Sequence, residues 1–119
     1  MTSAMNEHQH QVMLFKWMDS EGILAFAVPN SGKRSMAQAN YMRQEGMRKG
    51  VPDILVCEPC GQYHGLFIEM KKPKTGKLSE EQREWLHELS LKGYATAVCY
   101  GFNEAKETVE NYLREGTWQ

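Results

Sequence analysis

Two acidic residues and one lysine stand where they could together act on a phosphate ester. Asp53 follows Pro52 at the start of one apolar run, and Glu69 and Lys71 close a second apolar run. Carboxylates are the ligands that Mg²⁺ and Mn²⁺ prefer, and phosphate oxygens readily complete the coordination of both ions. A lysine beside such an ion can stabilise phosphate charge or lower the pKa of the attacking water. These residue types indicate metal-dependent hydrolysis of a phosphodiester.

The two apolar runs predict neighbouring strands that would bring the acidic residues together. Residues 53–57 and 65–70 are separated by a short segment whose proline and glycine are typical of a hairpin turn. In an antiparallel hairpin the start of one strand lies beside the end of the next. We therefore expect Asp53 and Glu69 at the same edge of a sheet.

Alternation along the second strand places Glu69 and Lys71 on one face and Met70 on the other. The backbone carbonyl of Met70 is then a natural third protein ligand for the metal. The alternative is a solvent-facing Glu-x-Lys pair without function, which is common in strands. The metal site is favoured because Glu69 follows the apolar residues 65–68, and a buried charge usually needs an ion or a partner.

The remaining chain predicts helices and strands in alternation. Helices are indicated by apolar residues at helical spacing, and strands by short branched or aromatic runs. A capping box, Ser79 with Gln82, marks one helix start. The strand after that helix should lie parallel to a neighbour, which gives an α/β fold with a mixed four-stranded sheet flanked by helices. In chain order we predict a helix at 7–18, a buried strand at 23–28, a helix from Ser35 to about Gln44, strands at 53–57 and 65–70, a helix from Ser79 to Gly93, a strand at 94–100 and a helix capped by Asn103.

Length and composition favour one domain, residues 1–119, in the cytoplasm. No apolar run approaches the roughly 20 residues that cross a bilayer. The first eleven residues lack the apolar centre of a secretory signal. Three cysteines without such a signal are expected to be free thiols. Cys57 and Cys60 have the spacing of half a zinc site, but no second pair completes it.

Positive charge gathers in the middle of a chain whose net charge is only −1. Residues 33–77 hold nine lysines and arginines against four acids, whereas the rest holds five against eleven. This asymmetry favours one face that meets an anion, although a lysine run can also be an ordinary solvated surface.

Four segments, taken together and in this order, resemble the VRR-NUC (virus-type replication-repair nuclease) domains of the PD-(D/E)xK superfamily. The resemblance runs from about Glu7 to Tyr100 and implies a restriction-endonuclease-like core. The segments that carry it are Gly50-Val51-Pro52-Asp53-Ile54-Leu55-Val56, Phe67-Ile68-Glu69-Met70-Lys71, Gly76-Lys77-Leu78-Ser79-Glu80-Glu81-Gln82 and Gly93-Tyr94-Ala95.

The resemblance implies roles for individual residues. Asp53 and Glu69 would bind catalytic Mg²⁺, for which Mn²⁺ could substitute, and Lys71 would assist the water. Glu7, followed by Gln11, looks like the family's pair on the first helix and would complete the metal site. A glutamate favoured by the helix dipole explains Glu7 equally well. Gln82 resembles the family's glutamine near the water or phosphate, although its capping role explains it too.

The resemblance also implies DNA as the partner, in branched form such as a Holliday junction, and a viral or bacterial homodimer. No organic cofactor or membrane is expected. Two alternatives stay open: a sequence-specific restriction-type endonuclease, and a silent DNA-binding module on the same fold. We place Trp17, Phe26 and the methionines of the middle helix in the core, with a dimer interface as the alternative. The residues predicted to contact phosphates are Asn30, Lys33, Arg34, Arg48, Lys49, Lys72, Lys74 and Lys77.

Overall fold

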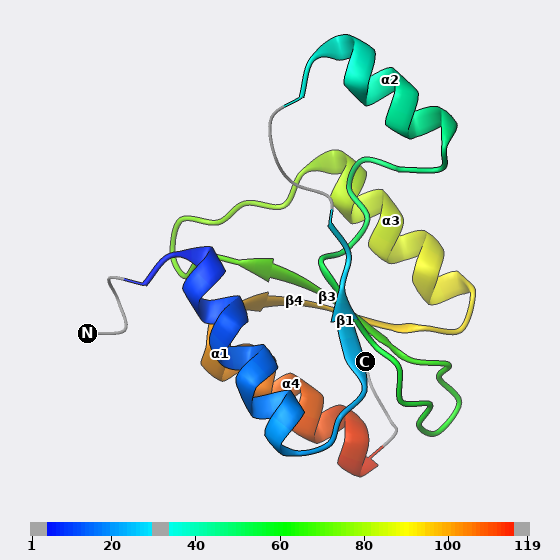
Figure 1. Cartoon of the computed structure of the whole chain (residues 1–119). Helices are drawn as coiled ribbons and strands as arrows, with labels where there is room; N and C mark the ends of the chain where they lie inside the picture. Colours follow the sequence, from blue (N-terminus) through cyan, green and yellow to red (C-terminus); the bar gives the residue numbers. More distant parts are fainter. Residues whose placement is uncertain (1–4, 30–33, 116–119) are drawn as a thin grey trace.

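The computed structural model describes residues 5–29 and 34–115. Its helices and strands follow the predicted order (Figure 1). The elements are α1 (Glu7–Ser20), β1 (Ala25–Ala27), α2 (Met36–Gln44), β2 (Ile54–Val56), β3 (Leu66–Lys71), α3 (Glu80–Leu91), β4 (Ala95–Tyr100) and α4 (Phe102–Glu115).

The four strands form one mixed sheet in the order β1-β2-β3-β4. β1 pairs with β2 and β2 with β3 in antiparallel fashion, whereas β3 and β4 are parallel. Ile54 lies opposite Ile68 in the β2–β3 hairpin, so the start of β2 meets the end of β3. The sequence-based expectation of a hairpin followed by a parallel strand is confirmed.

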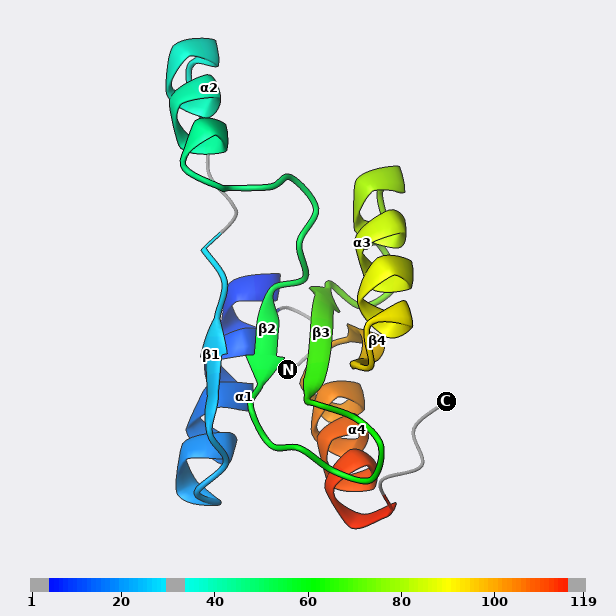
Figure 2. The same cartoon turned by 90° about the vertical axis from the view of Figure 1, so that its right-hand side faces the viewer.

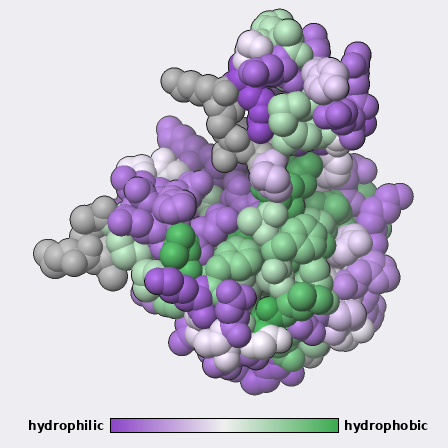
Figure 3. All heavy atoms as spheres, in the orientation of Figure 1, coloured by the Kyte–Doolittle hydropathy of each residue, from purple (hydrophilic) through white to green (hydrophobic). Residues whose placement is uncertain are grey.

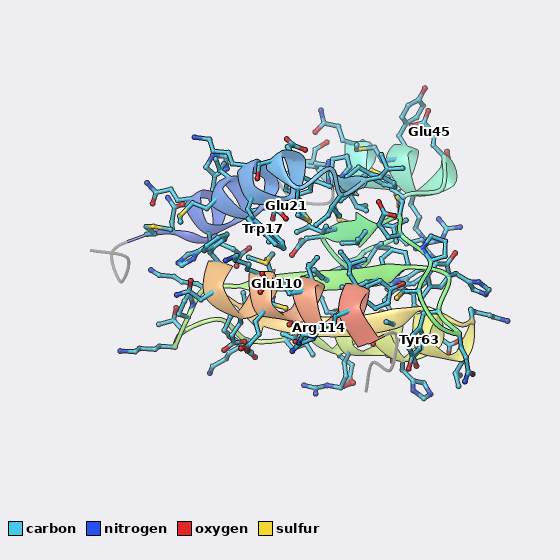
Figure 4. All side chains as sticks on the ribbon, turned by 90° about the horizontal axis from the view of Figure 1, so that it is seen from below. Trp17, Glu21, Glu45, Tyr63, Glu110 and Arg114 are labelled. Atoms are coloured by element: carbon cyan, nitrogen blue, oxygen red, sulfur yellow. The ribbon has the colours of Figure 1, made fainter. Side chains whose placement is uncertain are left out.

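The core lies between the sheet and the pair of helices α1 and α4. Leu14 and Met18 from α1 and Val109 and Tyr112 from α4 are fully buried, as is Ile68 of β3. Helix α3 covers the other side of the sheet (Figure 2). In the view from below, Trp17 of α1 lies beside α4 (Figure 4), where the Nζ atom of Lys106 stands 5.7 Å from its ring centroid. Trp17 packs against the core, as expected.

Side-chain caps begin three of the helices. Ser35 and Ser79 cap α2 and α3 in capping boxes, as their sequences predict. Asn6 caps α1 in the same way and was not foreseen. The last predicted helix is present, but its predicted cap was wrong, because α4 begins at Phe102 and Asn103 lies within its first turn. There the Phe102 N–H donates to Nδ1 of His10, a buried side chain of α1.

The expectation that residues 23–28 form a buried strand was also wrong. β1 is the edge strand of the sheet, and Leu24 and Phe26 are 65% and 51% exposed. An apolar run is equally consistent with an edge strand. The sequence pattern gives the types of side chain but not which other elements pack against the strand. The exposed apolar surface lies over β1 in the space-filling view (Figure 3).

Helix α2 stands away from the other elements (Figures 1 and 2). None of its residues is buried, and Met36 and Tyr41 are 82% and 66% exposed. The placement of its methionines in the core is therefore corrected. Elsewhere Met18 and Met70 do fill the core.

Two further sequence-based expectations concern cysteines and apolar helices. Cys57, Cys60 and Cys99 are all free thiols, as expected. Within residues 5–29 and 34–115, no helix combines the length and apolar character needed to cross a bilayer.

Candidate active site

The β2–β3 hairpin brings Asp53 and Glu69 to the same edge of the sheet. Asp53 lies immediately before β2, and its Oδ2 accepts a hydrogen bond of 2.7 Å from the backbone N–H of Met70. This bond fixes the carboxylate against the end of β3, next to Glu69. The predicted convergence of the two carboxylates therefore occurs in the structure.

Glu69 is the most deeply buried charged residue of this edge, with 2% of its surface exposed. Its Oε2 accepts a hydrogen bond of 3.0 Å from Nε2 of Gln82 and lies 3.4 Å from Nζ of Lys71. Its Oε1 is buried and has no hydrogen-bond partner. A buried carboxylate oxygen without a partner is costly, so this atom is suited to a ligand that supplies positive charge.

Burial makes ionisation of both carboxyl groups unfavourable. Burial, and after it the neighbouring Asp53 charge, raise the pKa of Glu69 to about 8, although Lys71 opposes both effects. Burial also raises the pKa of Asp53, against the lowering effect of the Met70 N–H. Two adjacent carboxylates repel each other, and this repulsion is relieved when they share one proton or one cation. A divalent cation would compensate both negative charges at once.

Gln82 caps α3 as predicted and also contacts Glu69, whereas its place near the water or phosphate stays a prediction. Its Oε1 accepts from the backbone N–H of Ser79 at 2.9 Å, which completes the cap of α3. Its Nε2 donates to Glu69 from the same side chain. The helix start thus orients the buried carboxylate, and the structural and site roles of Gln82 coexist.

Lys71 is held in place by the loop that follows β3. A Cβ atom at Gly76 would lie 2.7 Å from Cβ of Lys71 and 2.9 Å from the carbonyl oxygen of Lys72. Only a glycine allows the loop to approach this closely. The Lys71 side chain is 11% exposed, so its ammonium is confined beside Glu69.

Glu7 and Gln11 of α1 line the same groove as Asp53. Among the described residues, however, no three histidine, cysteine, aspartate or glutamate side chains are gathered closely enough to bind one ion. Glu7 as a metal ligand therefore stays a prediction. Likewise, no third such side chain joins Cys57 and Cys60 in the described part of the chain.

Arginines and a lysine form a basic pocket between α2 and the segment that follows it. Arg34, Arg48 and Lys49 line it, as does Arg43 of α2, which was not among the predicted phosphate contacts. None of the described residues that line this pocket is acidic. Of the other predicted phosphate contacts, Asn30 and Lys33 lie outside the described residues. Those on the connection between β3 and α3 are exposed: Lys72, Lys74 and Lys77.

Comparisons with known proteins give a consistent result. The model of the VRR-NUC domain family matches residues 5–103. A solved structure described as "VRR_NUC domain protein" aligns with a TM-score of 0.83 and 22% identity, covering 98% of this chain and 94% of that one. A second, "VRR_NUC domain", aligns with a TM-score of 0.63 and 24% identity, covering 89% and 96%. No curated protein matches significantly.

The mixed sheet flanked by helices, with an acidic edge, is a restriction-endonuclease-like α/β fold of nuclease type. The family match spans most of the sequence. The chain belongs to the VRR-NUC domain family.

Proposed function

We propose that this protein is a Mg²⁺-dependent endonuclease that hydrolyses phosphodiesters in branched DNA, such as a Holliday junction. The observation that carries the proposal is the partnerless Oε1 of Glu69, buried beside Asp53 and Lys71. A strand-borne acidic pair with an adjacent lysine has the components that metal-assisted phosphate hydrolysis requires.

The residues of this edge fit a hard divalent cation. Asp53 and Glu69 supply carboxylate oxygens, Met70 would add its backbone carbonyl, and Glu7 would complete the set from α1. When bound, Mg²⁺ or Mn²⁺ would neutralise charge on the scissile phosphate and activate the attacking water. We propose no organic cofactor.

The other residues of the site act by position and charge. Lys71, whose Nζ lies 3.4 Å from Glu69, would hold the attacking water and place positive charge beside the phosphate. Gln82 keeps the Glu69 carboxylate oriented toward the edge. The basic pocket and the lysines after β3 would contact other phosphates, which gives affinity without reading sequence.

We further propose that the protein acts as a homodimer in the cytoplasm. A junction is large compared with a chain of 119 residues, and a two-fold dimer would present two active centres to it. The exposed apolar side chains of α2, Met36 and Tyr41, support self-association. The free thiols suit a reducing compartment.

The first test is cleavage of end-labelled four-way junction, flap, linear duplex and single-stranded DNA in Mg²⁺, Mn²⁺ or EDTA. We expect metal-dependent cutting of the branched substrates, abolished in Lys71→Ala. Lys92→Ala is the matched control, since that exposed lysine lies beyond the far end of α3.

Each alternative has its own signature in this experiment. Discrete bands from linear duplex, independent of branching, would favour a sequence-specific restriction-type enzyme. Binding without cleavage under every metal condition would favour a silent DNA-binding module. Activity that survives both EDTA and Lys71→Ala would exclude the proposed centre.

A further inference from the structure

A groove of about 560 Å³ lies between α1 and β1, and Asp53 is one of the residues that line it. The two elements that form its sides lie next to each other in Figure 1. Its size falls within the roughly 300–1,000 Å³ of common ligand pockets. The groove is lined by Glu7, His8, Gln11, Val12, Phe15, Lys16, Asp19, Ala27, Val28, Pro29 and Asp53.

The chemistry of the groove changes along α1. At the start of the helix the lining is polar, with Glu7, His8 and Gln11. Val12 and Phe15 add apolar surface further along the helix, before Lys16 and Asp19, and residues 27–29 add apolar surface beside Asp53, whose backbone carbonyl accepts from the Val28 N–H. The groove therefore combines polar side chains with apolar ones and one aromatic ring. Such a lining suits a flat ligand that has an apolar face and a polar edge.

We propose that this groove receives one unpaired nucleobase of the DNA, adjacent to the phosphate that is cleaved. The inference rests on the proposed nuclease function, because it takes the scissile phosphate to lie at Asp53. The nucleotide next to that phosphate must then lie close to Asp53, which also lines the groove. Its base would lie against Phe15 and Val12, and its polar edge would face His8 and Gln11.

A nucleobase suits the lining better than a second sugar-phosphate unit does. Bases stack on aromatic and apolar side chains, whereas phosphates favour clusters of lysine and arginine. Lys16 is the single lysine or arginine among the described lining residues, and Glu7, Asp19 and Asp53 would repel an additional phosphate. The basic pocket beside α2, by contrast, has no carboxylate among its described lining residues and suits the backbone of the DNA.

The groove gives a physical reason for selecting branched DNA. A base held in a continuous duplex must leave its stack and its partner before it can enter a pocket, which costs free energy. A nucleotide at a flap, an overhang or a junction is already unpaired or easily unpaired. The enzyme would therefore prefer substrates with an unpaired nucleotide at the cut, whatever the sequence.

The experiment removes the base from the DNA and the ring from the protein, separately and together. Flap substrates carry one abasic nucleotide, scanned across the branch point, and affinity is measured by fluorescence anisotropy in Mg²⁺. Lys71→Ala provides the background, so that binding is measured without cleavage. We expect one position at which loss of the base weakens binding by about fivefold or more, in line with stacking of a base on an aromatic residue.

Phe15→Leu keeps most of the apolar volume but lacks the aromatic ring. It should remove most of the difference in affinity between the intact and the abasic flap. Val12→Ala should weaken binding of the intact flap, whereas Met13→Ala should leave it unchanged. These neighbours on α1 form a matched pair, because Val12 and Met13 are 39% and 37% exposed and only Val12 lines the groove. Equal binding of intact and abasic flaps at every position would overturn the proposal, and so would equal effects of Val12→Ala and Met13→Ala.

The two proposals fail in different ways. Wild-type protein that cuts intact and abasic flaps equally well remains a nuclease, but the base groove is refuted. If the protein cuts no substrate but binds an abasic flap more weakly at one position, the base groove is supported and the proposed nuclease activity is refuted. Absence of DNA binding would refute both.

Discussion

Glu69 is electrostatically the most unfavourable residue of the described structure. It is almost completely buried, it has Asp53 as a neighbour, and one of its oxygens has no partner. A fold that only needed to be stable would gain from a neutral residue at this position. An ionisable group that lowers the stability of the fold is typical of functional sites, where the group is needed for binding or catalysis.

The first prediction is that Glu69→Gln stabilises the metal-free protein at alkaline pH and abolishes cleavage. The pKa of Glu69 is raised from 4.5 to about 8, so its contribution to stability is present below pH 4.5 and lost as pH rises through 8. Wild-type protein in EDTA should lose on the order of 4 kcal/mol of unfolding free energy between pH 5 and pH 8.5 from this group. Glu69→Gln should lack most of that loss.

Urea unfolding at the two pH values measures the difference. Burial raises the pKa of Cys99 to about 11 and that of Tyr112 to about 12. The effect of both groups on stability therefore falls mainly above this window and is shared by the variant. An identical pH dependence of wild type and Glu69→Gln would contradict the prediction.

The second prediction is that metal binding releases protons near neutral pH. Burial raises the pKa values of Asp53 and Glu69, so a cation must displace a proton from the pair. Calorimetric titration with Mn²⁺ at pH 7 should give heats that depend on the ionisation enthalpy of the buffer. Affinity should fall as pH falls. Asp53→Asn should weaken binding at least tenfold, and buffer-independent heats would speak against this site.

Residue types and strand order were sufficient to predict the acidic centre. Asp53, Glu69 and Lys71 could be placed together because a hairpin has only one way to join the start of one strand to the end of the next. The partnerless oxygen of Glu69 and the bond from Met70 could not be predicted, since both depend on atomic positions. The second function of Gln82 was equally hidden, because the side chain that caps α3 also reaches Glu69.

At the scale of elements, the third prediction concerns Gly76 in the loop between β3 and α3. Gly76→Ala would place a methyl group 2.7 Å from Cβ of Lys71, so the loop or the lysine must move. Displacement of a catalytic group by about 1 Å can cost up to a hundredfold in rate. We expect kcat to fall at least tenfold while the folded structure, followed by circular dichroism, is retained.

Gly46→Ala is the control for this variant. Gly46 has a φ of +109° but no atom within 4 Å of an added Cβ, so its substitution strains the backbone without touching the site. It should lower stability and leave kcat of the folded protein unchanged. Equal loss of kcat in both variants would mean that Gly76 has no specific effect on Lys71.

Element order was predictable because each helix and strand has a local signature, whereas exposure was not. The exposed β1 and the unburied α2 were both assigned to the core from apolar residues such as Phe26 and Met36. Burial depends on which other elements cover a segment, and local periodicity contains no such information. The start of α4 was misplaced for a related reason, because its Phe102 N–H is satisfied by His10, 92 residues earlier in the chain.

At the scale of the whole molecule, α2 is the least expected feature. A helix of nine residues is too short to be stable in water by itself, since isolated helices shorter than about 12–15 residues are marginal. Its capping box and apolar side chains nevertheless specify a helix, which implies that it packs on something in solution. A second copy of this chain would supply an apolar surface in the exposed Leu24 and Phe26 of β1.

The fourth prediction is therefore that the protein is a dimer that depends on α2. Sedimentation velocity should give a dimer for wild type and a monomer for Met36→Glu combined with Tyr41→Glu, because charges at these exposed positions cost nothing in a monomer but disrupt an apolar contact. Met13→Glu introduces the same charge on α1, outside α2, and should stay dimeric. In the double variant junction cleavage should fall while cutting of a short flap persists, since each active centre is built from one chain. A wild-type monomer at micromolar concentration would refute the dimer, and a dimeric double variant would move the interface away from α2.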